Sequence, residues 1–382
     1  MALQKNHGLN SYDSTHITPI TKPQTWIEVA VGAFNHNVAY YKNIIGYHNK
    51  LAVVIKGNGY GHGLHQIASL CEQNNFVDWL CVAQLSEGLA LQNITKPILV
   101  LGYSDVSPEY AVNKNIHFMV DHLEYAQTLN NIGKKHSYRF NVHVKIDTGL
   151  SRMGVSAPQA YAFIQQLQNF DYIHIAGVYS HFSASDSNPE FTAHQLEQYN
   201  NTLTMLNQNN IHPDYLHMSN SASTTTIAYP EHFNFFRIGL GIYGLGQDRA
   251  HLQPVMSWKT RITNIKTVPT NSPVSYAGSF ITTRTTRLAL LPIGYYDGYE
   301  FRFSNKTVVM INGSCVPVIG RIAMNVTIVD VTDIHAAIGD EVTLLGAAAN
   351  ITAHDLADIA EIKNVREVIT GINPTIARMI TF

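Results

Sequence analysis

The feature that most constrains the fold is a row of eight short apolar runs between residues 27 and 245, separated by longer amphipathic stretches. Many of these runs are continuous Val, Ile, Leu and Phe, which is typical of strands buried on both faces of a parallel sheet. They lie at 51–55, 79–83, 98–101, 116–120, 140–146, 173–179, 215–218 and 235–240. Eight strand–helix units predict an α/β fold with a (β/α)8 barrel of the TIM type. A doubly wound open sheet is the alternative, although it usually has fewer strands.

Helical patterns lie between the runs, at 34–49, 123–131, 157–169 and 191–207. Asp121, just before the second of them, is a plausible N-cap because its short carboxylate can accept a hydrogen bond from a first-turn N–H group. The regular alternation favours a barrel that continues to about residue 248.

The alternation of strand-like and helix-like patterns ends at about residue 250. Five β-like runs follow, at 258–268, 287–291, 307–311, 316–319 and 326–331, with turn residues at 271–273, 312–313 and 339–340. Long helical patterns are scarce until 353–362. We therefore expect a flexible leader at 1–24, the barrel at 25–248 and a mostly-β C-terminal domain at 249–382.

Composition excludes several classes of protein. Charged residues make up 14% of the chain and the net charge is −2, without a basic stripe that nucleic acid would need. No run of about 18 apolar residues predicts a membrane span, and the polar start does not resemble a signal peptide. Three cysteines without a C-x-x-C pair indicate neither a disulfide framework nor a metal site. A cytoplasmic protein is expected.

The carboxyl ends of the predicted strands carry the chemistry, because active sites of such barrels collect there. The first run ends at Lys56, which is followed by a glycine-rich segment, 57–63. A lysine that closes a buried strand is costly unless it is paired or reactive, and the glycines let backbone approach a ligand. The alternative is a lysine whose amine simply extends into solvent.

Two further strand ends carry titratable groups. Lys145 shares one strand face with His143 and Asp147, so it points into the barrel or against the helices and needs an anionic partner. Asp147 could form an ordinary ion pair with it, or the lysine could itself be modified. His181 follows the sixth run, where a lone histidine is more often a core residue than a catalyst.

The last two strand ends are suited to bind phosphate. Ser221 stands at a predicted helix start, and the backbone N–H groups of Gly239 and Leu240 follow the eighth run. Barrels often bind phosphate at these two loops. The simpler interpretation is helix capping by Asn220 and Ser221.

Together these ends offer a lysine able to bond to an aldehyde, a phosphate site and an arginine, Arg237, which are the groups that pyridoxal phosphate requires. No G-x-G-x-x-G turn followed by a helix is found, which disfavours a dinucleotide.

At this point the chain resembles the alanine racemase family. Residues 56–63, K-G-N-G-Y-G-H-G, are similar to the family's K-A-N-A-Y-G-H-G motif, with both alanines replaced by glycine. Residues 147–154, D-T-G-L-S-R-M-G, resemble D-T-G-M-G-R-x-G. Shorter matches lie in order at 25–29, 35–37, 180–182, 220–222, 237–239, 274–276, 294–299 and 320–324.

The resemblance implies a pyridoxal-phosphate racemase that interconverts L- and D-alanine and supplies D-alanine for peptidoglycan. Lys56 would hold the cofactor and act as one catalytic base, and Tyr276 would be the other base on the opposite face. Racemisation requires this arrangement, because a proton leaves one face of Cα and returns to the other.

The resemblance also implies roles for other residues. Tyr60, Ser221, Gly239 and Leu240 would hold the cofactor phosphate, with Asn220 beside them; Arg237 would face the pyridine nitrogen, with His181 behind it. Arg152 would contact the cofactor oxygen and the substrate carboxylate, and Met324 and Tyr295 would also contact substrate. Lys145 matches a lysine that is often carbamylated, which would provide an anion for Arg152. Members form head-to-tail homodimers in which the second domain of one chain completes the site of the other.

Two positions depart from the family pattern. Asn325 follows Met324 where the family usually has aspartate, and Arg366 stands where a tyrosine facing the phosphate and the substrate is expected. These changes predict broader specificity, including some activity on serine or another polar amino acid. Alternatives outside the racemases are an amino-acid decarboxylase on the same scaffold, a non-enzymatic pyridoxal-phosphate carrier, and a barrel without a cofactor.

Overall fold

Eight parallel strands form the first part of the molecule in the computed structural model, which describes residues 23–382. The predicted leader at 1–24 lies outside the described residues except for its last two positions. All eight predicted strands are present, so the predicted barrel is confirmed. They are β2 (Lys50–Val54), β3 (Trp79–Val82), β4 (Ile98–Val100), β5 (Ile116–Val120), β6 (Phe140–Asp147), β8 (Ile173–Tyr179), β9 (Tyr215–His217) and β10 (Phe235–Ile238).

The strand order is that of a nearly closed barrel. The ladder runs β10-β2-β3-β4-β5-β6-β8-β9, with the short β7 (Val155–Ser156) paired to the end of β6. Strands β9 and β10 are not paired by a ladder of backbone hydrogen bonds, and Asn234 links them instead. The Asn234 N–H donates to the Leu216 carbonyl (3.4 Å), and the Asn234 side-chain oxygen accepts the Leu216 N–H (3.0 Å). This cyclic order excludes the doubly wound open sheet.

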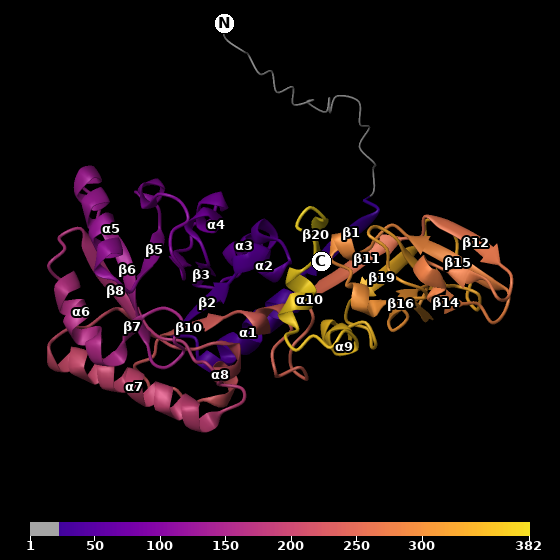
Figure 1. The fold of residues 1–382 in the computed structure, drawn as a ribbon. Helices are drawn as coiled ribbons and strands as arrows, with labels where there is room; N and C mark the ends of the chain where they lie inside the picture. The colour runs from indigo at the N-terminus through magenta and orange to yellow at the C-terminus, as the bar shows by residue number, and fades with distance from the viewer. Residues whose placement is uncertain (1–22) are drawn as a thin grey trace, which may run out of the picture.

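Helices surround the barrel, as Figure 1 shows. They are α1 (Val31–Ile45), α3 (Leu64–Gln73), α4 (Leu85–Ala90), α5 (Leu123–His136), α6 (Ala160–Leu167), α7 (Pro189–Gln208) and α8 (Ser221–Thr226). The four predicted helices correspond to α1, α5, α6 and α7. The predicted N-cap role of Asp121 is wrong, because His122 holds that position of α5. The Asp121 carboxylate instead accepts the Gly154 N–H (2.8 Å) and the Tyr103 hydroxyl (3.1 Å).

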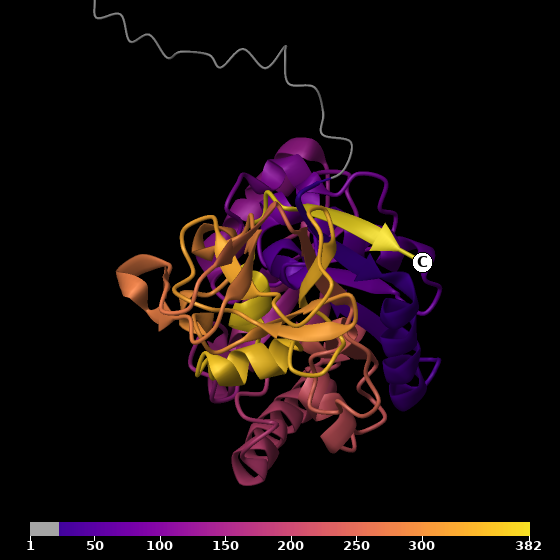
Figure 2. The ribbon, with the colours of Figure 1, turned by 90° about the vertical axis from the view of Figure 1, so that its right-hand side faces the viewer.

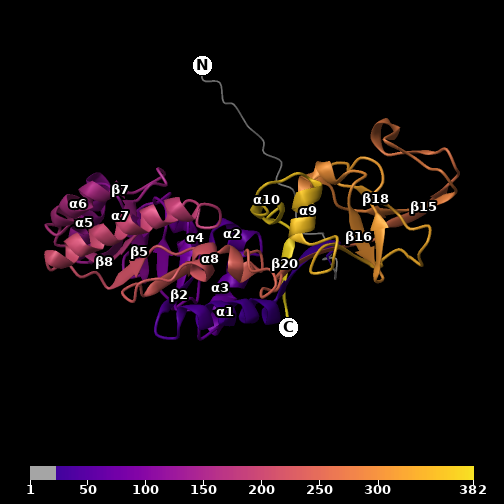
Figure 3. The ribbon, with the colours of Figure 1, turned by 90° about the horizontal axis from the view of Figure 1, so that it is seen from below.

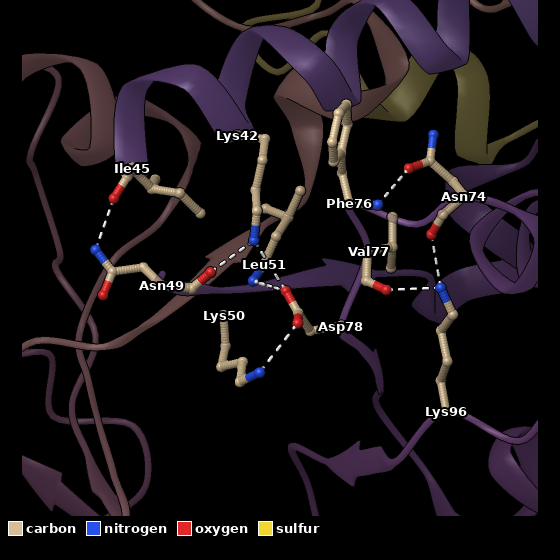
Figure 4. A network of polar contacts seen from close by, with 10 residues as sticks. All are labelled: Lys42, Ile45, Asn49, Lys50, Leu51, Asn74, Phe76, Val77, Asp78 and Lys96. Carbon is tan, nitrogen blue, oxygen red and sulfur yellow. Dashed lines mark hydrogen bonds and ion pairs between the residues drawn. The ribbon is translucent and has the colours of Figure 1, made fainter. Parts of the chain in front are cut away.

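A network of paired charges closes the amino end of the barrel (Figure 4). The Asp78 carboxylate accepts hydrogen bonds from Lys42 Nζ (3.1 Å), Lys50 Nζ (3.2 Å) and the Leu51 N–H (2.9 Å). Nearby, Lys96 Nζ donates to the Asn74 and Val77 carbonyls, each at 2.6 Å. The Lys42 side chain is only 5% exposed, so its charge is stabilised by a carboxylate and a carbonyl rather than by water.

The second part is mostly β, as predicted. Its larger sheet has the order β17-β16-β19-β11-β1-β20, and a three-stranded sheet, β12-β15-β18, stands beside it. The bounds are β1 (Thr25–Ala30), β11 (Met256–Arg261), β12 (Asn264–Val268), β15 (Thr286–Leu291), β16 (Val308–Ile311), β17 (Ser314–Pro317), β18 (Thr327–Asp330), β19 (Glu341–Leu345) and β20 (Ala377–Thr381). A two-stranded pair, β13 (Pro273–Val274) and β14 (Phe280–Ile281), and two helices, α9 (Ala353–Ile359) and α10 (Arg366–Thr370), complete it.

The first strand among residues 23–382, β1, belongs to this second sheet. We expected residue 25 to begin the barrel, but β1 pairs antiparallel with β11 and parallel with β20. Its residues form a short β-like segment, and nothing local indicates which sheet it joins. Pairing with two distant strands decides its place.

The two parts lie side by side along the long axis of the molecule, with β1, β11, β20 and α10 at their junction (Figures 1 and 3). Figure 2 views the molecule from the side of the second part, with the barrel behind it. In the part of the chain from residue 23 onward, no helix combines the length and apolar character needed to cross a membrane.

Candidate active site

A pocket of about 980 Å3 opens at the carboxyl end of the barrel and reaches α10. Ten of the residues predicted for the site line it, from five different strand ends or the loops that follow them. These residues are Lys56, Tyr60, Lys145, Arg152, His181, Asn220, Ser221, Arg237, Gly239 and Leu240. The fold therefore brings the cofactor-site candidates into one cavity.

Lys56 begins a tight left-handed turn, assigned as α2 (Lys56–Tyr60). Gly57 and Gly59 have φ values of 63° and 61°, a region in which glycine avoids the strain that alanine would carry. The N–H of Gly57 donates to Glu87 Oε1 at 2.8 Å, which fixes the turn against α4. This conformation gives a physical reason for glycine at the two positions where the family motif has alanine.

The electrostatic environment of Lys56 favours its neutral amine. Burial lowers the pKa of Lys56, the Arg152 guanidinium lowers it further, and Glu87 acts in the opposite direction. A lysine whose pKa is lowered in a pocket can act as a nucleophile or a base.

Three groups from distant segments converge beside β10. Ser221 Oγ accepts the N–H groups of Gly239 (3.2 Å) and Gly241 (3.0 Å). A Cβ on Gly239 would lie 2.7 Å from the Tyr60 hydroxyl, so glycine leaves the space open. Burial raises the pKa of Tyr60, which keeps its hydroxyl protonated as a hydrogen-bond donor. Asn220 caps α8, as the simpler interpretation expected, by accepting the Ser223 N–H at 2.9 Å.

Arg237 is a buried cation, 3% exposed, that also lines the pocket. Its guanidinium donates to the Ser180 carbonyl (2.9 Å), to His181 Nδ1 (3.2 Å) and to His217 Nδ1. The guanidinium also lies 5.0 Å from the centre of the Tyr179 ring. The side chain is thus fixed on several sides at the wall of the pocket.

Lys145 is also buried, at 4% exposed. Burial lowers its pKa to about 8, and Arg152 and Arg237 lower it as well. No ion pair joins it to Asp147, whose Oδ1 instead accepts the N–H groups of Gly149 (2.9 Å) and Ser151 (3.1 Å). The ordinary Lys–Asp pair is therefore not formed, and a substantial fraction of the Lys145 amine is neutral near pH 8.

Both halves of the chain match known family models. Residues 29–247 match the alanine racemase N-terminal domain, and residues 255–380 match the alanine racemase C-terminal domain. The chain belongs to the alanine racemase family.

Individual relatives agree with this assignment. The chain is 34% identical to alanine racemase 2 of Caldanaerobacter subterraneus, over 93% of this chain and 94% of the relative. It is also 34% identical to the alanine racemase of Symbiobacterium thermophilum, over 93% and 96%. The solved alanine racemase of Clostridium difficile 630 has a TM-score of 0.86 at 33% identity, covering 92% of this chain and 94% of that structure.

Three predicted site residues of this alanine racemase family member lie apart from the pocket. Tyr276, Tyr295 and Met324 are 69%, 47% and 53% exposed and stand on the second domain. The Tyr295 N–H donates to the Ala323 carbonyl (3.1 Å), next to Met324, and the hydroxyl of Ser275, next to Tyr276, donates to the Arg321 carbonyl (2.5 Å). These contacts hold the three side chains on neighbouring segments, which we call the tyrosine face.

The residues that depart from the family pattern have different surroundings. Arg366, on α10, lines the pocket, and its guanidinium donates to Asn364 Oδ1 at 3.2 Å. Its positive charge lowers the pKa of Lys56. Asn325 is exposed on the second domain beside Met324.

Sequence reasoning missed several residues of the site. Glu87, which holds the Lys56 turn, and Lys363 and Arg249, which line the pocket, were not predicted. His217, the last residue of β9, was not assigned a role, although its Nδ1 contacts the Arg237 guanidinium. Residues 239–244 spell G-x-G-x-x-G, but they form a 3-10 turn, η4 (Leu240–Tyr243), rather than the start of a dinucleotide-binding helix.

Proposed function

We propose that this chain interconverts L- and D-alanine with pyridoxal phosphate bound in the barrel pocket. The observation that carries the proposal is the shared cavity of Lys56, the Ser221–Gly239–Tyr60 cluster and Arg237. An amine of lowered pKa, a set of phosphate-binding groups and a donor for the ring nitrogen are the three requirements of this cofactor.

The residues present fit pyridoxal phosphate. The space at Gly239, which a Cβ would fill, and the protonated Tyr60 hydroxyl suit its phosphate. Arg237 would donate to the ring nitrogen without giving up its proton, because guanidinium stays charged. When bound, the cofactor delocalises the negative charge that develops on Cα.

The chain's own groups move the protons. Lys56 would take or return the α-proton on one face of the substrate, and Tyr276 would do so on the other. Arg152, without an ion-pair partner among the described residues, would bind the substrate carboxylate. A carbamate on Lys145 would orient Arg152, and the partly neutral amine of Lys145 supports that modification.

The exposed tyrosine face supports a head-to-tail homodimer. Since Tyr276 does not line the pocket of its own chain, a second copy would bring its Tyr276, Tyr295 and Met324 to the pocket. We also propose that the enzyme acts in the cytoplasm and that its D-alanine enters peptidoglycan.

A second candidate is a racemase that also accepts serine. Arg366 places an additional charged hydrogen-bond donor in the pocket wall, where it could contact a polar substrate side chain.

Loss of optical rotation of L-alanine and L-serine tests both candidates. Lys56→Ala and Tyr276→Phe should each abolish most of the activity on alanine, whereas Lys50→Ala and Tyr296→Phe serve as matched controls. Borohydride reduction followed by peptide mapping should label Lys56. Labelling of another lysine, or full activity of Tyr276→Phe, would contradict the two-base assignment. Turnover of alanine alone would reject the serine-accepting candidate.

A further inference from the structure

A row of histidines runs through the interior of the barrel and ends at Arg237. His117 on β5 lies against His143 on β6, with 3.2 Å between His117 Nδ1 and His143 Nε2. His143 Nδ1 lies 2.8 Å from His217 Nε2, on β9, and His217 Nδ1 contacts an Nη atom of Arg237. His143 and His217 are fully buried, and His117 is 7% exposed.

The three rings are neutral. Burial, with a smaller contribution from the neighbouring His174, lowers the pKa of His117 to about 4. Burial, together with the positive charge of Arg237, holds the pKa of His143 and His217 well below the usual value. Each ring therefore carries one proton, on one nitrogen or the other.

Arg237 decides which nitrogen carries that proton. A guanidinium can only donate, so His217 Nδ1 must accept and His217 Nε2 must bear the hydrogen. His217 Nε2 then donates to His143 Nδ1, so His143 bears its hydrogen on Nε2. The same step repeats at His117, whose Nδ1 accepts from His143. The whole row runs in one direction.

A missing side chain makes this row possible. Gly177 on β8 lies between β6 and β9, in register with His143 and with Tyr215. A Cβ on Gly177 would overlap His143 Nδ1 and lie 2.7 Å from its Cε1. The atom that a side chain here would displace is the one that accepts from His217.

We propose that His143 and His117 are positioning residues, which extend the hydrogen-bond row behind His217 and hold Arg237 fixed as a cation in the barrel interior. None of the ion pairs in residues 23–382 includes Arg237, so no carboxylate neutralises it. The row supplies aligned imidazole dipoles with the acceptor nitrogen toward the guanidinium, and such chains polarise cooperatively. Because Arg237 does not release its proton, the histidine row orients the guanidinium and does not transfer protons. The effect on catalysis rests on the proposed function; the row itself does not.

Ring nitrogen NMR of the holoenzyme, labelled with 15N-histidine, tests the row directly. Single substitutions assign the signals. We expect His117, His143 and His217 to be neutral, with the proton on Nε2 in all three, between pH 6 and 9. A proton on Nδ1 of any of these rings, or a charged ring, would overturn the proposal whatever the activity of the enzyme.

Gly177→Ala tests the consequence for Arg237 without altering any histidine. We expect the His217 and His143 ring signals to shift and kcat for alanine to fall about tenfold, the effect of losing about one hydrogen bond, with KM nearly unchanged. The pH midpoint of the cofactor absorbance should also move. Gly88→Ala is the matched control, because a Cβ there would meet only ordinary contacts of 3.5 Å or more.

His117→Phe provides a second variant at the far end of the row, should Gly177→Ala fail to fold. It leaves every contact of Arg237 itself in place, so an effect on the cofactor absorbance must pass through His143 and His217. Leu99→Ala, another buried residue of the barrel interior, should lower the melting temperature without moving that absorbance. Equal behaviour of His117→Phe and Leu99→Ala would reduce the row to ordinary packing and overturn the proposal.

Discussion

The two ends of the barrel differ in whether their charged side chains form ion pairs. At the amino end, Asp78 neutralises Lys42 and Lys50 within one network (Figure 4). At the carboxyl end, Lys56, Lys145, Arg152 and Arg237 line one pocket, and no ion pair between described residues includes any of them. Arg152 and Arg237 keep this pocket positive even where the lysine amines are neutral, and this charge favours a doubly charged phosphate and a carboxylate as ligands. In this barrel, the paired charges at the amino end serve stability, and the unpaired cationic groups at the carboxyl end serve binding and catalysis.

The largest expected difference between the two ends concerns a single lysine. Lys56→Ala should lower kcat/KM for alanine by about 10³-fold or more, because a catalytic base is removed, while the melting temperature changes little. Lys50→Ala, at the other end, should leave kcat/KM unchanged. Racemisation rates of the two variants are measured by polarimetry. Equal rates would contradict the division of roles between the two ends of the barrel.

The lowered pKa of Lys145, at the carboxyl end, predicts that the free energy of unfolding changes with pH. The folded-state pKa of about 8 lies below the unfolded value of about 10.4, so the unfolded chain binds more protons between these pH values. The free energy of unfolding should therefore rise with pH from 8 to 10.4, by up to about 3 kcal/mol from this residue.

Urea denaturation in buffer free of carbon dioxide measures this change. Lys145→Met should lose the rise, whereas Lys50→Met should retain it. Identical pH profiles for wild type and Lys145→Met would contradict the environment that we describe for this amine.

At the amino end, the effect should fall on stability alone. Asp78→Asn leaves the nearly buried Lys42 without its carboxylate and should cost about 3 kcal/mol of unfolding free energy, with kcat unchanged. Asp333→Asn removes the partner of Arg284 in an exposed pair and should have no measurable effect. Chemical denaturation measures the free energy of unfolding of both variants. A fall in kcat for Asp78→Asn would contradict the claim that the amino end contributes to stability alone.

The smallest expected effect concerns the turn at Lys56. Gly57→Ala must adopt a φ near 63° and should cost about 1 kcal/mol of unfolding free energy, although a Cβ there would meet no atom within 4 Å. Gly313→Ala, at a φ of 80° in a turn of the second domain and equally open, should cost a similar amount. Neither substitution should lower kcat, because the added Cβ at position 57 meets no atom and Lys56 keeps its place.

The sequence predicted the barrel well because each of its strands is a local apolar run. It also predicted the groups of the pocket, since the carboxyl ends of parallel strands meet at one edge. The place of β1 could not be predicted, because partners near residues 258 and 379 decide it. Nor could the histidine row, which depends on contacts across the barrel and on the empty space at Gly177. Asp121 was misassigned as a cap because its preferred donor, the Gly154 N–H, lies 33 residues away.

The position of β1 between β11 and β20 in the second sheet has a consequence for how the protein is made. Residues 25–30 leave the ribosome before any barrel strand, yet one of the two neighbours of this strand, residues 377–381, follows only after the whole barrel has been synthesised. Residues 25–30 must wait for all the residues up to β20 before they can pair on both edges, and such long-range pairing is slow. The barrel strands need no such delay, so during synthesis the barrel should assemble while β1 still lacks its final neighbour.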